Sequence, residues 1–252
     1  MPRTVLAVFA HPDDETFGPG GTLAALAAAG DRVELLCATR GEAGTIGESA
    51  SFGPRRLADI RTGELAEAVR VLGIQPPVVM DLPDGGLADL APRALLEPIV
   101  QLIRGRRPEL LVTFHPDGLS GHDDHKTVTT RLLEAFDLAA DEGYEPGLGA
   151  PHRASRIWVY SIPRSKASRV TYRKLYDVPD EELDAVIDVR PFVTAKRAAV
   201  TAHATQKPFI DKLEAFLGDL EGFWSEEAFV LAKGAPLPAN ASRPVNDLYL
   251  GL

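Results

Sequence analysis

The sequence predicts an α/β fold in which a mostly parallel β-sheet is flanked by helices. Strand-like and helix-like stretches alternate, with short links, through the first two-thirds of the 252 residues. Several strand-like stretches are continuous apolar runs, as expected of strands covered on both faces. The composition, with 45% hydrophobic and 25% charged residues, supplies enough apolar mass for a sizeable core. This alternation implies βαβ units, and therefore parallel strands.

The first part of the chain has the clearest element boundaries. Residues 4–10 and 32–39 are predicted strands. The helix between them covers residues 21–29 and is closed by Gly30, since glycine commonly follows the last turn of a helix. The alternation then continues with predicted helices at residues 55–72, 93–104 and 124–140, and predicted strands at residues 78–82, 109–114 and 156–162.

The last third of the chain is less regular. Glycine and proline make residues 141–152 a predicted surface loop. Beyond this loop we expect a strand at residues 185–189 and helices at residues 194–205 and 210–220. No repeat or shift in composition marks a boundary, so residues 1–252 are predicted to form one domain.

Charge and cysteine content exclude several classes of function. The net charge is −9 and no run of lysine or arginine exceeds two residues, which argues against nucleic acid and anionic membranes as partners. Cys37 is the only cysteine and is predicted to be packed in a strand, so a disulfide or a thiolate metal cluster is excluded. The apolar run over residues 5–10 is too short for a signal peptide or a membrane span. We expect a cytoplasmic protein that acts on a small molecule, either alone or as a homo-oligomer.

Two charged loops follow predicted strands. The sequence AHPDDE, at residues 10–15, comes where the first strand ends, and TFHPDGLSGHDDH, at residues 113–125, comes where the strand at residues 109–114 ends. Ligands of open α/β sheets bind beyond the carboxyl ends of the strands. If the two strands run parallel in one sheet, these loops lie at the same edge and can meet.

The spacing within the two loops indicates a metal site. His11 and Asp14 are three residues apart, and His122 and His125 have the same spacing at the start of a predicted helix. Imidazole nitrogen and carboxylate oxygen suit zinc or a similar divalent ion. In the alternative reading the acids cap helices and the histidines are solvated, which leaves the accumulation of charge behind a buried strand unexplained.

Five segments resemble a known superfamily, the PIG-L and LmbE-like zinc-dependent N-acetylglucosaminyl deacetylases. They are AHPDDE, TRGEAG at residues 39–44, RTGELAEAVRVLG at 61–73, GHDDHKTV at 121–128 and AHATQ at 202–206. The resemblance implies the LmbE-like fold, a Rossmann-like sheet with the active site at the carboxyl ends of its strands. It also implies a small-molecule amino-sugar conjugate as substrate, without identifying the sugar or its aglycone.

The resemblance also implies roles for individual residues. His11, Asp14 and His125 would be the metal ligands, and Asp13 would be the general base acting on a metal-bound water. The metal would be zinc, with ferrous iron or another divalent ion as alternatives, because the same ligands accept each of them.

The second loop contains two further candidate site residues and two differences from the sequence that is usual in the superfamily. His122 would stabilise the oxyanion or protonate the leaving amine, and Asp124 would orient His122 through its other N–H. Members of the superfamily often have proline where this chain has Asp123, and several have tyrosine where it has Ser120.

Four residues are candidate substrate contacts. Arg61 matches an arginine that contacts substrate in the superfamily, although pairing with Glu64 one helical turn away explains it as well. Asp84 precedes two glycines, so it is either a ligand for sugar hydroxyls or a turn residue. Glu42 is expected to line the pocket, because the loop after the second strand opens at the same edge. His203 is expected to approach the site or to lie on a helix surface.

The predicted function is therefore a metal-dependent hydrolase that removes an N-acetyl group from an N-acetylglucosamine-type conjugate. The alternatives are hydrolysis of another small amide, or a non-catalytic carbohydrate-binding relative. Nucleotide binding is disfavoured, because the glycine pattern after the first strand fails at Leu23, and a serine-hydrolase motif is lacking.

Overall fold

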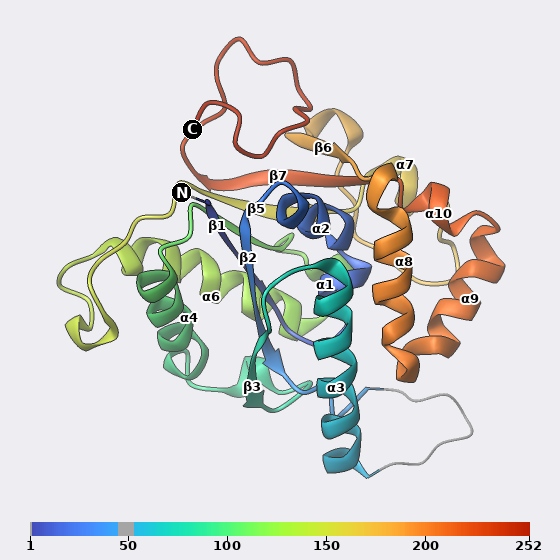
Figure 1. Ribbon diagram of the computed structural model, residues 1–252, viewed down its shortest axis with the longest axis horizontal. Helices are drawn as coiled ribbons and strands as arrows, with labels where there is room; N and C mark the ends of the chain where they lie inside the picture. Colours follow the sequence, from blue (N-terminus) through green and yellow to red (C-terminus); the bar gives the residue numbers. More distant parts are fainter. Residues whose placement is uncertain (1, 45–52) are drawn as a thin grey trace.

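The computed structural model describes residues 2–44 and 53–252, and its centre is one seven-stranded sheet with strand order β3-β2-β1-β4-β5-β7-β6 (Figure 1). The strands are β1 (Thr4–Phe9), β2 (Arg32–Thr39), β3 (Val78–Leu82), β4 (Leu110–Phe114), β5 (Arg156–Ser161), β6 (Ala185–Asp188) and β7 (Glu226–Gly234). Strands β1 to β5 pair in parallel, which confirms the predicted mostly parallel sheet.

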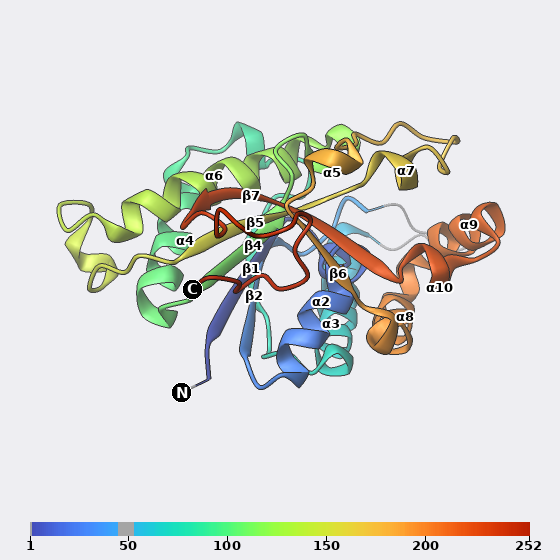
Figure 2. The same ribbon diagram turned by 90° about the horizontal axis from the view of Figure 1, so that it is seen from above.

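Helices cover both faces of the sheet, with α4 and α6 on one face and α2, α3 and α8 on the other (Figures 1 and 2). The helices are α1 (Asp14–Phe17), α2 (Gly20–Ala28), α3 (Pro54–Leu72), α4 (Arg93–Arg106), α5 (Gly118–Gly121), α6 (Asp123–Ala140), α7 (Arg164–Ala167), α8 (Val193–Ala202), α9 (Lys207–Leu217) and α10 (Leu220–Phe223). Short 3₁₀ turns lie at Leu87–Asp89, Pro146–Leu148, Asp180–Glu182, Arg190–Phe192 and Ala204–Gln206. No described helix is long and apolar enough to cross a membrane.

The central strands are almost fully buried. Every residue from Val5 to Ala10 has an exposure of 1% or less, and β4 is buried along its whole length. Continuous apolar runs predict this burial on both faces. Polar groups can reach solvent only where such strands end, so the carboxyl edge of the sheet carries the candidate site.

Strand β7 was not predicted, and it runs antiparallel between β5 and β6. Its apolar residues follow two acids, Glu226 and Glu227, which resemble a solvent-exposed turn in the sequence. Glu227 is in fact buried, because its carboxylate accepts the backbone N–H groups of Gly21 and Thr22 at 2.8 and 2.7 Å. Lys196 of α8 donates to the same carboxylate at 2.6 Å. A buried, fully paired acid therefore fastens β7 to the start of α2.

The segment between β6 and β7 forms an excursion from the sheet. It contains α8, α9 and α10, and α9 and α10 lie beyond α8 at the side of the molecule (Figure 2). The two ends of the excursion meet, since the backbone N–H of Val189 donates to the carbonyl of Ser225 at 2.9 Å. The predicted helix at residues 194–205 ends earlier than expected, so that His203 follows α8 rather than lying within it.

Candidate metal centre and active site

The two charged loops meet at the carboxyl edge of the sheet, as the sequence predicts. Strands β1 and β4 are parallel neighbours, with Val5 opposite Leu110 and Ala7 opposite Val112. The loop after β1 turns at once into α1, and the loop after β4 leads through α5 into α6.

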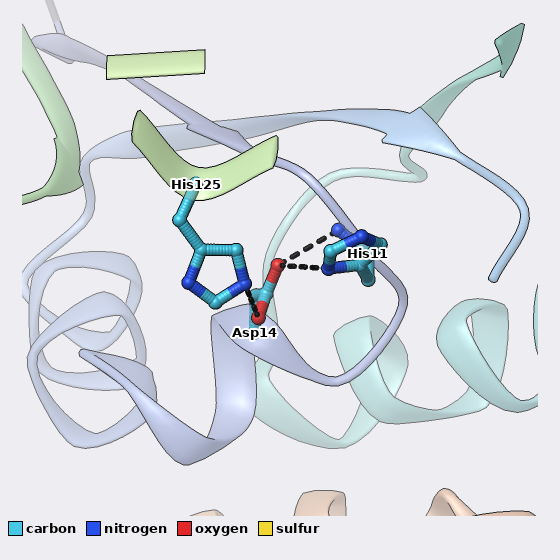
Figure 3. Close-up of side chains that lie close together, drawn as sticks. All are labelled: His11, Asp14 and His125. Atoms are coloured by element: carbon cyan, nitrogen blue, oxygen red, sulfur yellow. Dashed lines mark hydrogen bonds and ion pairs between the residues drawn. The ribbon is translucent and has the colours of Figure 1, made fainter. Parts of the chain in front are cut away.

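Three side chains from these loops converge on one point (Figure 3). One ligand atom from each of His11, Asp14 and His125 lies within 4.8 Å of the others. Asp14 lies between the two imidazoles, with Oδ1 at 3.3 Å from Nε2 of His125 and Oδ2 at 3.5 Å from Nδ1 of His11. The three residues are 7–9% exposed, so the cluster is largely shielded from bulk water.

The outer nitrogen of each imidazole is held by an acceptor. Nδ1 of His125 lies 3.1 Å from the carbonyl oxygen of Gly118. Nε2 of His11 lies 3.0 Å from a carboxylate oxygen of Asp124 and 3.0 Å from one of Asp84. Because these oxygens accept, the outer nitrogens carry protons, and the inner nitrogens, which face the carboxylate of Asp14, are the atoms available to a metal ion. Histidines that bind metals are held in this way.

The carboxylates around the cluster favour positive charge at its centre. Burial lowers the pKa of His11, but the carboxylates of Asp124, Asp14 and Asp84 outweigh burial and raise that pKa to about 12. For Asp14 the effects have the opposite sign: burial raises its pKa, but the two histidines outweigh burial and hold the pKa well below its usual range. Two imidazole nitrogens and a carboxylate at one point fit a divalent ion that prefers mixed nitrogen and oxygen ligands.

The structure corrects the expected contact of Asp124. Its carboxylate accepts from the backbone N–H groups of Gly85 and Leu87 at 2.7 and 3.0 Å, in addition to contacting His11. The hydrogen bond that joins Asp124 to His122 runs in the opposite sense, from the backbone N–H of Asp124 to Nδ1 of His122 at 3.2 Å. The expectation that Asp124 orients His122 is therefore wrong, because the carboxylate is committed to His11.

His122 lies at the entrance of the site. Its ring stacks against that of His125, with centroids 4.9 Å apart. Partial burial, followed by the neighbouring imidazoles, lowers the pKa of His122. Nδ1 of His122 accepts the backbone N–H of Asp124 at the start of α6, so a neutral His122 carries its proton on Nε2. The departure at Asp123 lies outside the cavity and pairs with Lys126, whereas Ser120 lines the cavity.

Asp13 has the environment of a general base. Its backbone has a φ of 118°, which is strained for a residue with a side chain. Buried Arg61 holds this conformation by donating to the carbonyls of Pro12 and Gly41 and, at 3.1 Å, to Oδ2 of Asp13. Burial raises the pKa of Asp13 to about 6, against the lowering effect of Arg61. Arg61 lines the cavity, but its guanidinium is largely occupied by protein groups.

Glu42 and Asp84 fasten two loops to each other. Glu42 accepts the backbone N–H of Asp84 at 2.8 Å, and Asp84 accepts that of Ala43 at 2.9 Å. Asp84 lines the cavity, but Glu42 is not among the residues that line it. The structure thus places Glu42 in support of the site, and the expectation that it lines the pocket is wrong.

His203 is also placed away from the substrate. It is fully buried, and its Nε2 lies 2.8 Å from Oε1 of Glu15, whose other oxygen accepts the backbone N–H of Asp13 at 3.0 Å. A residue with no exposed surface cannot contact a bound molecule, so the expected substrate contact is wrong. Glu15 and His203 instead support the backbone of Asp13 from below the cavity.

A cavity of about 540 Å³ opens beside the cluster, and much of its wall was not predicted. We call one part of it the apolar lobe, which is lined by Phe17, Ile162, Val170, Leu175, Phe209, Leu213, Phe223 and Trp224. Most of these residues come from the irregular last third of the chain. They belong to no motif, and only the clustering of aromatic residues between positions 209 and 224 hints at them.

The fold and the cluster together define an α/β protein with a candidate metal centre at the carboxyl edge of its sheet. The sequence model of the PIG-L family, described as GlcNAc-PI de-N-acetylase, matches residues 6–136. The chain belongs to this family.

Individual relatives agree with this assignment. The chain is 34% identical to a protein of Rhodococcus jostii named 1D-myo-inositol 2-acetamido-2-deoxy-alpha-D-glucopyranoside deacetylase, over 99% of this chain and 98% of the relative. Its fold is similar to that of N,N'-diacetylchitobiose deacetylase from Pyrococcus horikoshii, with a TM-score of 0.69 and 22% identity over 91% of this chain and 83% of the other. The fold is also similar to that of GalB, a 4-carboxy-2-hydroxymuconate hydratase of Pseudomonas putida, with a TM-score of 0.71 and 20% identity over 95% and 100% of the two chains. The fold alone therefore does not fix the reaction.

Proposed function

We propose that the protein is a divalent-metal-dependent hydrolase that removes the acetyl group from an N-acetylglucosamine-type conjugate. The observation that carries the proposal is the cluster of His11, Asp14 and His125, with both outer nitrogens bonded outward and the carboxylate of Asp13 beside it. A relative that is 34% identical over nearly the whole of both chains and is named as a deacetylase of an amino-sugar conjugate supports the choice of reaction.

The metal would be held by Nδ1 of His11, the carboxylate of Asp14 and Nε2 of His125. When bound, zinc or ferrous iron lowers the pKa of water and polarises a carbonyl group. Asp124 and Asp84 hold His11 in the orientation that presents Nδ1 to the centre, and Gly118 does the same for His125.

Asp13 and His122 act on different atoms of the reaction. Asp13 takes a proton from the attacking water, since its pKa of about 6 leaves it ionised at neutral pH yet basic enough to accept. His122, which lines the cavity, donates a hydrogen bond from Nε2–H to the carbonyl oxygen as negative charge develops there, and the proton that Asp13 has taken passes to the departing amine. Arg61 fixes the strained backbone of Asp13 and so fixes the direction from which the proton is removed.

Release of free amine from N-acetylglucosamine conjugates tests the proposal, with zinc and ferrous iron loaded separately. Asp13→Asn is expected to lower kcat by roughly a hundredfold to ten-thousandfold while the protein keeps its metal and its fold. Asp123→Asn is the matched control, because this neighbouring carboxylate is 79% exposed and is paired with Lys126. A metal-loaded protein that releases no amine from any conjugate, or an Asp13→Asn variant that keeps full activity, would contradict the proposal.

A further inference from the structure

The cavity extends well beyond the groups that the reaction uses. The side chains of His11, Asp14, His122 and His125 line the same cavity as the side chains of the apolar lobe. The lobe begins close to the chemistry, since Phe17 lies at the end of the short helix α1 that begins at Asp14. A molecule whose amide reaches the cluster therefore has its remaining part directed along walls that include the lobe.

The lobe is a formed aromatic surface. The ring of Phe17 meets that of Phe209 edge-on at 5.3 Å between centroids, and that of Trp224 at 6.4 Å. These rings belong to a second hydrophobic cluster, separate from the core beneath the sheet, in which Trp224 and Leu213 are buried. Burial of an aromatic or aliphatic group against such a surface is favourable in proportion to its area.

Polar side chains also line the cavity beside the lobe, namely Lys166, Tyr172, Arg173 and Gln206. Lys166 has its Nζ committed to the backbone carbonyls of Phe223 and Glu226. The hydroxyl of Tyr172 is itself buried. A polyhydroxylated group placed against the aromatic rings themselves would lose water without regaining an equal number of hydrogen bonds, which carries a penalty for each hydroxyl left unpaired.

We propose that the natural substrate carries an apolar aglycone, an aryl or cyclic alkyl group of about one ring, which occupies the apolar lobe. This inference rests on the proposed function, because removal of acetyl fixes the acyl group as a small one and leaves the aglycone as the part that fills the lobe. The aglycone thus differs in polarity from the inositol in the name of the Rhodococcus relative.

The test compares three 2-acetamido-2-deoxy-α-D-glucopyranosides, the methyl, phenyl and 1D-myo-inosityl glycosides, with the metal-loaded protein. The phenyl glycoside is expected to exceed both others in kcat/KM by roughly tenfold or more, as burial of a ring in an apolar pocket implies. Phe209→Ala is expected to reduce the phenyl-to-methyl ratio several-fold. Lys207→Ala is the control, because Lys207 lies on the same helix, pairs with Asp211 at the surface and does not line the cavity.

The outcomes separate the two proposals. Turnover in which the inosityl or methyl glycoside equals or exceeds the phenyl glycoside overturns the apolar aglycone and leaves the deacetylase intact. A preference for an N-hexanoyl over an N-acetyl methyl glycoside assigns the lobe to the acyl chain and also overturns the inference. If no glycoside is turned over, calorimetric measurement of binding to the metal-loaded Asp13→Asn variant decides. Tighter binding of the phenyl than of the methyl glycoside, lost when Phe209→Ala is added, supports an apolar aglycone in the lobe. Equal binding of the two glycosides rejects it.

Discussion

The metal end and the apolar lobe of the same cavity are built in opposite ways. At the metal end, buried polar groups are tied by short hydrogen bonds, such as that of His11 to Asp124 at 3.0 Å. In the lobe, aromatic rings meet edge-on, as Phe17 meets Phe209, and few polar groups are free. The metal end comes from two loops of the first half of the chain, whereas most of the lobe comes from the last third.

This difference separates reactivity from selectivity. Directional bonds fix the positions of reacting groups within tenths of an ångström, and a loss there affects every substrate. Apolar contacts are non-directional and scale with the area buried, so a change in the lobe alters the ranking of substrates. The variants below change groups at the metal end, and the first is compared across the three aglycones.

The largest effect is expected from His125→Ala. The substitution removes one of three ligands, so we expect loss of metal and a fall in kcat of at least roughly a thousandfold, equal for methyl, phenyl and inosityl glycosides. Metal content by atomic absorption and kcat for each glycoside check this. A fall confined to one aglycone would show that the two ends do not act separately.

A smaller effect is expected from Asp124→Asn, which weakens the acceptor that holds His11. Substitution of such supporting groups typically lowers metal affinity by about ten- to a hundredfold. Competition with a chelator of known affinity measures the change, and Asp123→Asn serves as the control. Unchanged affinity in Asp124→Asn would mean that Asp84 alone orients His11.

The pH dependence of the reaction tests Asp13. Burial raises its pKa to about 6, and a general base acts only when it is deprotonated. We expect kcat/KM to be full above this pH and to fall tenfold per unit below it, at a pH no higher than about 6 because a bound cation favours the ionised form. A pH–rate profile whose acidic limb is centred above pH 7 would assign the base to another group.

The smallest effect is expected on stability, from His203→Ala. Loss of the bond to Glu15 leaves a buried acceptor unpaired, which costs about 1–3 kcal/mol in the free energy of unfolding. Burial lowers the pKa of His203, but Glu15 and Asp13 outweigh it and raise that pKa above its ordinary value. The contribution of His203 is therefore full below about pH 6.5 and is lost as pH rises through the raised pKa. Denaturant unfolding of metal-free protein at several pH values measures the difference, and a constant difference would contradict this pairing.

Local patterns sufficed to predict the strands of the metal end and the two loops that follow them, and the resemblance to the PIG-L and LmbE-like proteins implied His11, Asp14 and His125 among the residues of those loops. The buried strands are recognisable in the sequence as apolar runs. His11, Asp14 and His125 lie in loops that follow two parallel neighbouring strands, so these loops are expected to meet. Partners chosen by tertiary packing could not be predicted from these patterns. The carboxylate of Asp124 bonds to His11, 113 residues away, and not to neighbouring His122, because the loops after β1 and β3 approach it in space.

Strand β7 and the lobe were missed for a related reason. Glu227 is buried because a helix terminus and Lys196 neutralise it, and the local sequence carries no sign of either partner. His203 appeared as a surface or substrate residue, since its burial depends on Glu15 at the opposite end of the chain. Aromatic residues such as Phe209 and Trp224 line the cavity only because the excursion between β6 and β7 folds back over it.

That excursion leaves and re-enters the sheet at neighbouring positions, where Val189 and Ser225 are joined by a backbone hydrogen bond. A segment with such closely spaced ends can in principle be exchanged as a unit, because neither the strands nor the metal ligands lie within it. Two constraints accompany any graft. Position 196 must keep a lysine, or Glu227 must be changed with it, because an uncompensated charge would otherwise remain in the interior. Position 203 must keep a histidine, because its partner Glu15 holds the backbone of Asp13. The fold thus offers a route by which new specificities can be built, in evolution or in the laboratory, on unchanged chemistry.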